Sequence, residues 1–153
     1  MSLVYGLSTP LELLSKLRRA ENRLTNAISD EDDIAIGDAI YDFAVTGYHL
    51  RDWVAKGTNL RAEVNAFVDE SPLLHACRDI CNSSKHFEID RYMPKTKDVY
   101  FSASPLRETE LKMKGAIKIL MSDGQKFEVA QFASQIVTLW EQFFDRFDLG
   151  TGT

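Results

Sequence analysis

One stretch of the sequence, residues 71–87, gathers the side chains that can do chemistry. It reads SPLLHACRDICNSSKHF, in which Ser71 is a favoured helix N-cap and Pro72 fits the first helical position. At about 100° per residue, one side of the predicted helix is apolar and carries both cysteines of the chain. The other side carries His75, Arg78, Asp79, Asn82, Lys85 and His86. Two of the three histidines in the chain, an arginine and an asparagine therefore share one helix face.

An imidazole and a guanidinium on one helix face are suited to metal-independent cleavage of RNA. His86 can act as general base on the 2′-hydroxyl or as general acid on the leaving oxygen, because the pKa of imidazole lies near neutral pH. Arg78 can stabilise the charge that develops on the phosphoryl group, and Asn82 can orient the imidazole or the phosphate. The candidate catalytic residues are therefore Arg78, His86, Asn82 and Asp79, and the candidate binding residues are Lys85, His75 and His49.

This arrangement resembles the HEPN superfamily, whose compact helical bundle carries an arginine, a polar residue directly after it, and then a histidine on a late helix. Here the matching residues are Arg78, Asp79 and His86, and the layout of residues 10–90 is similar. Seven residues separate Arg78 from His86, which is more than in the family pattern. The resemblance implies an RNase or RNA-binding domain of a toxin–antitoxin or anti-phage system. It also implies a site built across a homodimer, and a protein partner such as an antitoxin or a host protein.

Each of these residues also has a structural interpretation. A histidine at a helix C-terminus, such as His86, interacts favourably with the helix dipole and the last carbonyls. Arg78 can form an ordinary salt bridge with the acidic segment 31–70. His49 lies two turns after Asp42 on one predicted helix, which indicates a buried hydrogen-bonded pair rather than a catalytic dyad.

The distribution of charge favours a second function of a different class. The net charge is −5, but residues 31–70 carry nine acids against three bases, and residues 91–126 carry eight bases against four acids. Two electrostatically distinct surfaces are typical of a non-catalytic helical protein-interaction module, such as a phage or mobile-element accessory protein. A third hypothesis is that Arg78, Lys85 and His86 bind a small ligand or nucleotide. The sequence contains no glycine-rich phosphate loop, so it favours this hypothesis less than the other two.

Three structural outcomes separate these hypotheses. A nuclease needs Arg78 and His86 side by side in one exposed cleft. An interaction module predicts an exposed apolar patch elsewhere on the molecule. A ligand binder predicts a closed pocket that includes Lys85.

Cysteine content and hydropathy exclude several other classes. Cys77 and Cys81 lie one turn apart on the apolar side of their helix, where disulfide geometry is rarely met, so we expect buried free thiols. His75 and His86 point away from these thiols, so no metal site and no cofactor are predicted. No run is apolar and long enough for a membrane span, and no signal pattern is present, so a cytoplasmic protein without membrane contact is expected.

The hydrophobic pattern predicts a mainly α fold, with about five helices in a single domain of residues 1–153 and a helical bundle core over residues 9–87. Thr9-Pro10-Leu11-Glu12 is a capping box that starts a first helix ending near Ala27. The acids Glu31–Asp33 start a long second helix, in which Gly47 allows another helix to approach closely and Gly57 acts as the C-terminal cap. Residues 59–68 indicate a shorter third helix before Ser71.

A small β element is predicted between the bundle core and the last helix. Residues 98–102, 116–121 and 125–129 have strand composition, and Ser122-Asp123-Gly124 is a hairpin turn signal, so a small antiparallel hairpin or sheet is expected over residues 98–129. Residues 130–147 then form a closing helix with an aromatic stripe. Trp53 and Trp140 coincide with the helical apolar period, which indicates core positions.

Overall fold

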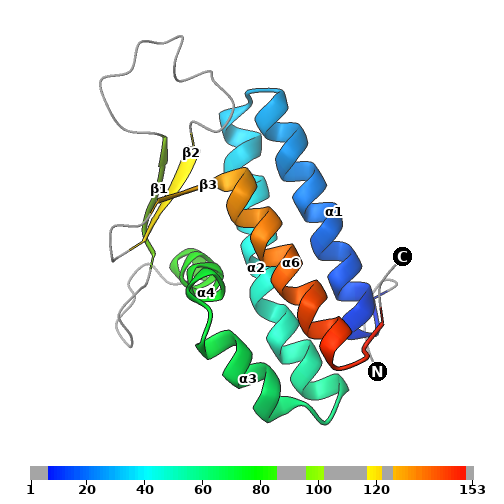
Figure 1. The fold of residues 1–153 in the computed structure, drawn as a ribbon. Helices are drawn as coiled ribbons and strands as arrows, with labels where there is room; N and C mark the ends of the chain where they lie inside the picture. The colour runs from blue at the N-terminus through cyan, green and yellow to red at the C-terminus, as the bar shows by residue number, and fades with distance from the viewer. Residues whose placement is uncertain (1–6, 86–95, 102–116, 122–125, 151–153) are drawn as a thin grey trace.

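The computed structural model describes residues 7–85, 96–101, 117–121 and 126–150, with side chains for residues 7–82 and 127–150. Within these residues it contains five helices and three short strands (Figure 1). Helices α1, α2 and α6 lie side by side, with α1 antiparallel to the other two, and α4 crosses them steeply on the side where the strands lie. The mainly helical fold predicted from the sequence is confirmed.

Helices α1 (Pro10–Ser29) and α2 (Asp33–Gly57) form where the capping signals predict. Thr9 Oγ1 accepts the N–H of Glu12 at 3.2 Å, and the Glu12 carboxylate accepts the N–H of Thr9 at 2.9 Å. Hydrogen bonds from Ser8, first through its backbone N–H, and from Thr9 hold the pKa of Glu12 below its usual value. At the start of α2, Asp32 accepts the N–H of Ala35 at 3.1 Å.

Gly57 ends α2 for a different reason from the one predicted. It is the last helical residue rather than the cap, and Thr58 caps the helix in an extended conformation with its hydroxyl donating to the Val54 carbonyl at 2.7 Å. A Cβ on Gly57 would lie 3.1 Å from the Pro10 ring. The missing side chain therefore lets the end of α2 contact the start of α1.

Helices α3 (Arg61–Asp69), α4 (Pro72–Lys85) and α6 (Val129–Arg146) complete the helical part. The predicted N-cap of α4 is confirmed, because Ser71 Oγ accepts the N–H of Leu74 at 3.3 Å. Aromatic rings join α3 to α6, with the Phe67 centroid 5.1 Å from that of Trp140 and 4.8 Å from that of Phe143. The aromatic stripe of α6 is buried as predicted at Phe132, Ile136, Trp140 and Phe143, while Leu139 and Phe147 are half-buried.

The β element is a minor part of the fold. Strands β1 (Thr96–Phe101), β2 (Ile117–Met121) and β3 (Lys126–Glu128) pair antiparallel in that order, with β1 near α4 and β3 near α6. The turn predicted at Ser122–Gly124 lies outside the described residues, so the hairpin stays a prediction.

The described helices share one hydrophobic core, to which α1, α2, α3, α4 and α6 all contribute buried apolar residues. None of the helices in the described part of the chain combines the length and hydropathy that a membrane span requires.

Four helices converge at Gly47, in the middle of α2. A Cβ there would lie 3.4 Å from Cys77 Sγ of α4, 3.6 Å from Ile136 Cγ2 of α6 and 3.7 Å from Leu17 Cδ1 of α1. The carbonyl of Gly47 also accepts the indole N–H of the fully buried Trp140 at 3.0 Å. The predicted close approach at Gly47 is confirmed, and it joins α1, α4 and α6 to α2.

Polar groups are also present between α1 and α6. Arg18 Nε donates to Glu141 Oε1 at 2.9 Å, and both side chains are partly exposed. Glu21 lies close enough to Glu141 to be repelled, and its Oε2 is buried without a hydrogen-bond partner within the described part of the chain. Burial and, secondarily, the Glu141 charge raise the pKa of Glu21.

Substituting Gly47 tests the four-helix convergence. An alanine Cβ meets its neighbours at van der Waals distance, so we expect Gly47→Ala to fold. The extra methyl groups of Gly47→Val have no space, and we expect a loss of about 1–3 kcal/mol in the free energy of unfolding. Urea unfolding measures this loss.

Gly37 supplies the matched control, because it lies on the same helix and a Cβ there would have no neighbour within 4 Å. We expect Gly37→Val to change stability by less than about 0.5 kcal/mol. Equal losses at both positions would contradict the convergence at Gly47.

Replacing Glu21 by glutamine tests the buried carboxylate. A raised folded-state pKa means that the ionised form destabilises the fold at neutral pH, and that this penalty disappears as the pH falls through the raised pKa towards 4.5. We therefore expect Glu21→Gln to raise the melting temperature at neutral pH and to have no such effect below pH 4.5. Glu63→Gln, at an exposed position on α3, is the control and should show neither effect.

Candidate functional site

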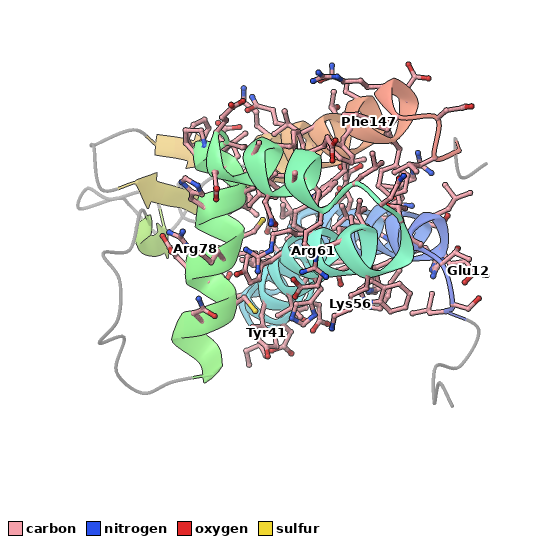
Figure 2. The ribbon with its side chains drawn as sticks, turned by 90° about the horizontal axis from the view of Figure 1, so that it is seen from below. Glu12, Tyr41, Lys56, Arg61, Arg78 and Phe147 are labelled. Carbon is pink, nitrogen blue, oxygen red and sulfur yellow. The ribbon has the colours of Figure 1, made fainter. Side chains whose placement is uncertain are left out.

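Three of the four predicted catalytic residues, Arg78, Asp79 and Asn82, lie on α4, which packs against α2 on one side and approaches β1 on another. Figure 2 shows Arg78 on the part of α4 that faces the strands. His75, Arg78 and Asn82 are half-buried. Lys85 is the last residue of α4, but its side chain lies outside the described residues, and so does the whole of His86. The structure therefore describes only part of the predicted site.

Asp79 does not belong to an exposed polar face, as the helical period predicts, but is buried with 3% of its surface accessible. From Leu73 to Asn82 no residue of α4 is exposed. The reason is that α4 has neighbours on more than one side, so that its polar side is covered as well as its apolar side.

Arg78 pairs with its neighbour Asp79. Its Nε and Nη2 donate to Asp79 Oδ1 at 3.2 and 3.1 Å, and the Arg78 side chain is 25% exposed. A carboxylate this deeply buried needs charged or polar partners, and Arg78 supplies one. The pair therefore has a structural role, whereas a catalytic role of Arg78 with His86 stays a prediction.

The two thiols of α4 are buried and free, as predicted. Burial is the main reason that the pKa of Cys77 is raised far above that of an ordinary thiol, with smaller contributions from Cys81 and Asp79. Such a thiol stays protonated and does not act as a nucleophile. Within residues 7–82 and 127–150, no cluster of three or more potential metal ligands is found.

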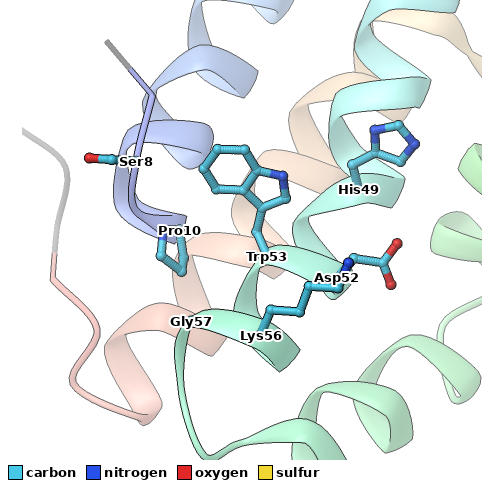
Figure 3. Close-up of a pocket in the computed structure, with 7 residues that line it drawn as sticks. All are labelled: Ser8, Pro10, His49, Asp52, Trp53, Lys56 and Gly57. Carbon is cyan, nitrogen blue, oxygen red and sulfur yellow. The ribbon is translucent and has the colours of Figure 1, made fainter. Parts of the chain in front are cut away.

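His49 lies on α2, whereas the other described candidates lie on α4. The predicted pair with Asp42 is not a buried one, because the Asp42 side chain is exposed. Thr46 Oγ1 donates to the Asp42 carbonyl at 2.9 Å and accepts from Lys16 Nζ at 3.0 Å. His49 instead lines a pocket between the start of α1 and the end of α2 (Figure 3).

This pocket was not predicted from the sequence. It has a volume of about 360 Å³ and is lined by Ser8, Pro10, His49, Asp52, Trp53, Lys56 and Gly57. Trp53 is half-buried and lines the pocket, whereas the sequence pattern placed it in the core with Trp140. The signal that was available is the spacing of His49, Asp52 and Lys56, which repeats every three or four residues and so shares one helix face.

The outward side of α2 is a second feature that was not predicted from the sequence. Ile34 is 80% exposed and Tyr41 is 42% exposed, and they are the exposed large hydrophobic residues among those the structure describes. They lie two turns apart and therefore on the same face of α2. We define the α2 outer face as Ile34, Asp38, Tyr41, Asp42 and Val45.

Acidic side chains predominate next to this face, although Lys16 of α1 bonds to Thr46 beside it. Residues 30–50 contain six acids and no lysine or arginine. All six acids are exposed: Asp30, Glu31, Asp32, Asp33, Asp38 and Asp42.

Comparisons with protein-family models, with curated proteins and with solved structures find no match to this chain.

Asparagine substitutions test the structural role of Asp79. We expect Asp79→Asn to lower the free energy of unfolding by about 1.5–3 kcal/mol, because it removes a buried charge-assisted pair. Asp52→Asn is the matched control, since Asp52 also pairs with the preceding arginine, at 3.3 Å, but is 48% exposed. There we expect a loss below about 1 kcal/mol. Equal losses in denaturant unfolding would contradict a special role for Asp79.

Proposed function

We propose that the chain is a non-catalytic helical interaction module that binds a protein partner through the α2 outer face. The observation that carries the proposal is the exposure of Ile34 and Tyr41 on one face of a helix whose flanking charges are acidic. Ile34 keeps 80% of its surface in water. Binding of a partner that covers this apolar surface would lower the free energy.

The dimensions of the face suit a helical or extended segment of a partner. From Ile34 to Val45 the helix rises by about 16 Å, at 1.5 Å per residue. An amphipathic segment lying along this length would place apolar side chains on Ile34 and Tyr41, in the manner of helix-in-groove recognition.

The acidic residues of this face favour a positively charged partner. Asp38 and Asp42 border the apolar residues, and the acidic run of residues 30–33 lies at the N-terminal end of the face. These charges favour lysine and arginine on the partner and increase its association rate, and they repel the phosphates of RNA. The partner is therefore a protein with a basic, partly apolar segment.

The residues of α4 support this choice over a nuclease. Arg78 is half-buried and bonded to a buried carboxylate, whereas an RNA-cleaving site needs its arginine available to the phosphoryl group. The pocket between the start of α1 and the end of α2 includes His49 but neither Arg78 nor any other residue of α4.

Site-specific photo-crosslinking in the native cells tests the proposal. A photo-reactive phenylalanine analogue replaces Ile34, and the adducts are identified by mass spectrometry. We expect one protein adduct, attached through a segment rich in lysine and arginine. Asp38→Lys in the same chain should lower its yield by about tenfold, the effect of roughly 1.4 kcal/mol.

The matched control places the same analogue at Asn65, an exposed position on α3, where no adduct is expected. An adduct with RNA or with a second copy of the chain would contradict the proposal, as would equal adducts at both positions.

A further inference from the structure

The pocket of Figure 3 has two walls of different origin. One wall comes from the start of α1, where the capping hydrogen bonds of Ser8 and Glu12 and the contact of Pro10 with Gly57 fix the backbone. The other wall is a single face of α2. Because both walls are held by regular structure, the pocket is formed before any ligand binds.

Rings form much of its surface. Trp53 lies between Pro10 and His49 in Figure 3, and Pro10 and Trp53 present apolar surface to the pocket. The volume of about 360 Å³ lies at the lower end of the range for small-molecule sites. The pocket therefore fits a compound about the size of one substituted ring.

Two hydrogen-bond donors of the pocket are open to solvent and therefore available to a ligand. Neither the indole N–H of Trp53 nor the Lys56 ammonium has a hydrogen bond or ion pair with the described residues. The other tryptophan of the chain shows the contrast, since the N–H of Trp140 donates to the Gly47 carbonyl. The Trp53 N–H is not buried within the protein, so it can donate to water or to a ligand that enters the pocket.

Asp52 limits the choice of ligand. One of its oxygens accepts from Arg51 at 3.3 Å, so the carboxylate keeps further acceptor capacity at the rim of the pocket. The Asp52 carboxylate repels other negative charges in the pocket. A ligand with one acidic group is therefore favoured over a ligand with several.

We propose that this pocket binds a small ring compound that carries one carboxylate or phosphate group. The ring packs against Trp53 and Pro10, and the acidic group accepts hydrogen bonds from the Trp53 indole N–H and from Lys56. The site lies at the opposite end of α2 from Ile34, so it is independent of the proposed protein-binding face.

Titration followed by NMR of the ¹⁵N-labelled protein tests the site, because the chain contains two tryptophans and therefore two indole N–H signals. The probes are phenylacetate, phenyl phosphate, neutral phenylacetamide and inorganic phosphate. We expect the two ring acids to shift the Trp53 signal with dissociation constants on the order of 1 mM. The Trp140 signal is the internal control and should not move. Phenylacetamide should bind about tenfold more weakly, and inorganic phosphate should cause no shift.

Lys56→Gln should remove the preference for the ring acids over phenylacetamide, while Arg19→Gln, at an exposed cation outside the pocket, should leave it unchanged. The signal dispersion of each spectrum reports whether the variant is folded. Equal affinity for phenylacetate and phenylacetamide, a Trp53 signal unmoved by every probe, or a preference that persists in folded Lys56→Gln would overturn the proposal.

Discussion

The packing at Gly47 is the constraint on which the rest of the structure depends. At this point α2 has no side chain, so the backbone meets Leu17 of α1, Cys77 of α4 and Ile136 of α6, and its carbonyl accepts the N–H of Trp140. A buried indole N–H without an acceptor would cost free energy. The hydrogen bond and the close contacts together set the position of α6 and the steep crossing of α4 over α2.

The position of α4 determines which polar groups are available for function. Since α4 lies between α2 and β1, its charged residues are drawn into the interior, where Arg78 and Asp79 pair with each other. Among the described residues, Ile34 and Tyr41 on α2 are the large hydrophobic side chains that stay exposed. In our account α4, which carries most of the candidate catalytic residues, therefore has a mainly structural role. The longer helix α2 beside it presents the interaction surface.

Local signals in the sequence predict the helices well, because a cap is decided by a few neighbouring residues. The box at Thr9 and Glu12 and the caps at Asp32 and Ser71 are confirmed for that reason. Burial of Asp79 could not be predicted, since it depends on how α4 packs within the fold and not on the helical period alone. The pocket was missed for the same reason, as it needs Pro10 of α1 beside Trp53 of α2. The helical period places a residue on a face, but only the tertiary packing decides what covers that face.

Metal-free RNA cleavage is the most direct test of the claim that the charged residues of α4 hold the fold together while α2 carries the function. The measurement compares the wild type with Arg78→Lys in EDTA, with the folding of both proteins checked by circular dichroism. Our account predicts no cleavage above the buffer blank for either protein. Cleavage by the wild type that is abolished in folded Arg78→Lys would contradict it and would make α4 the active site.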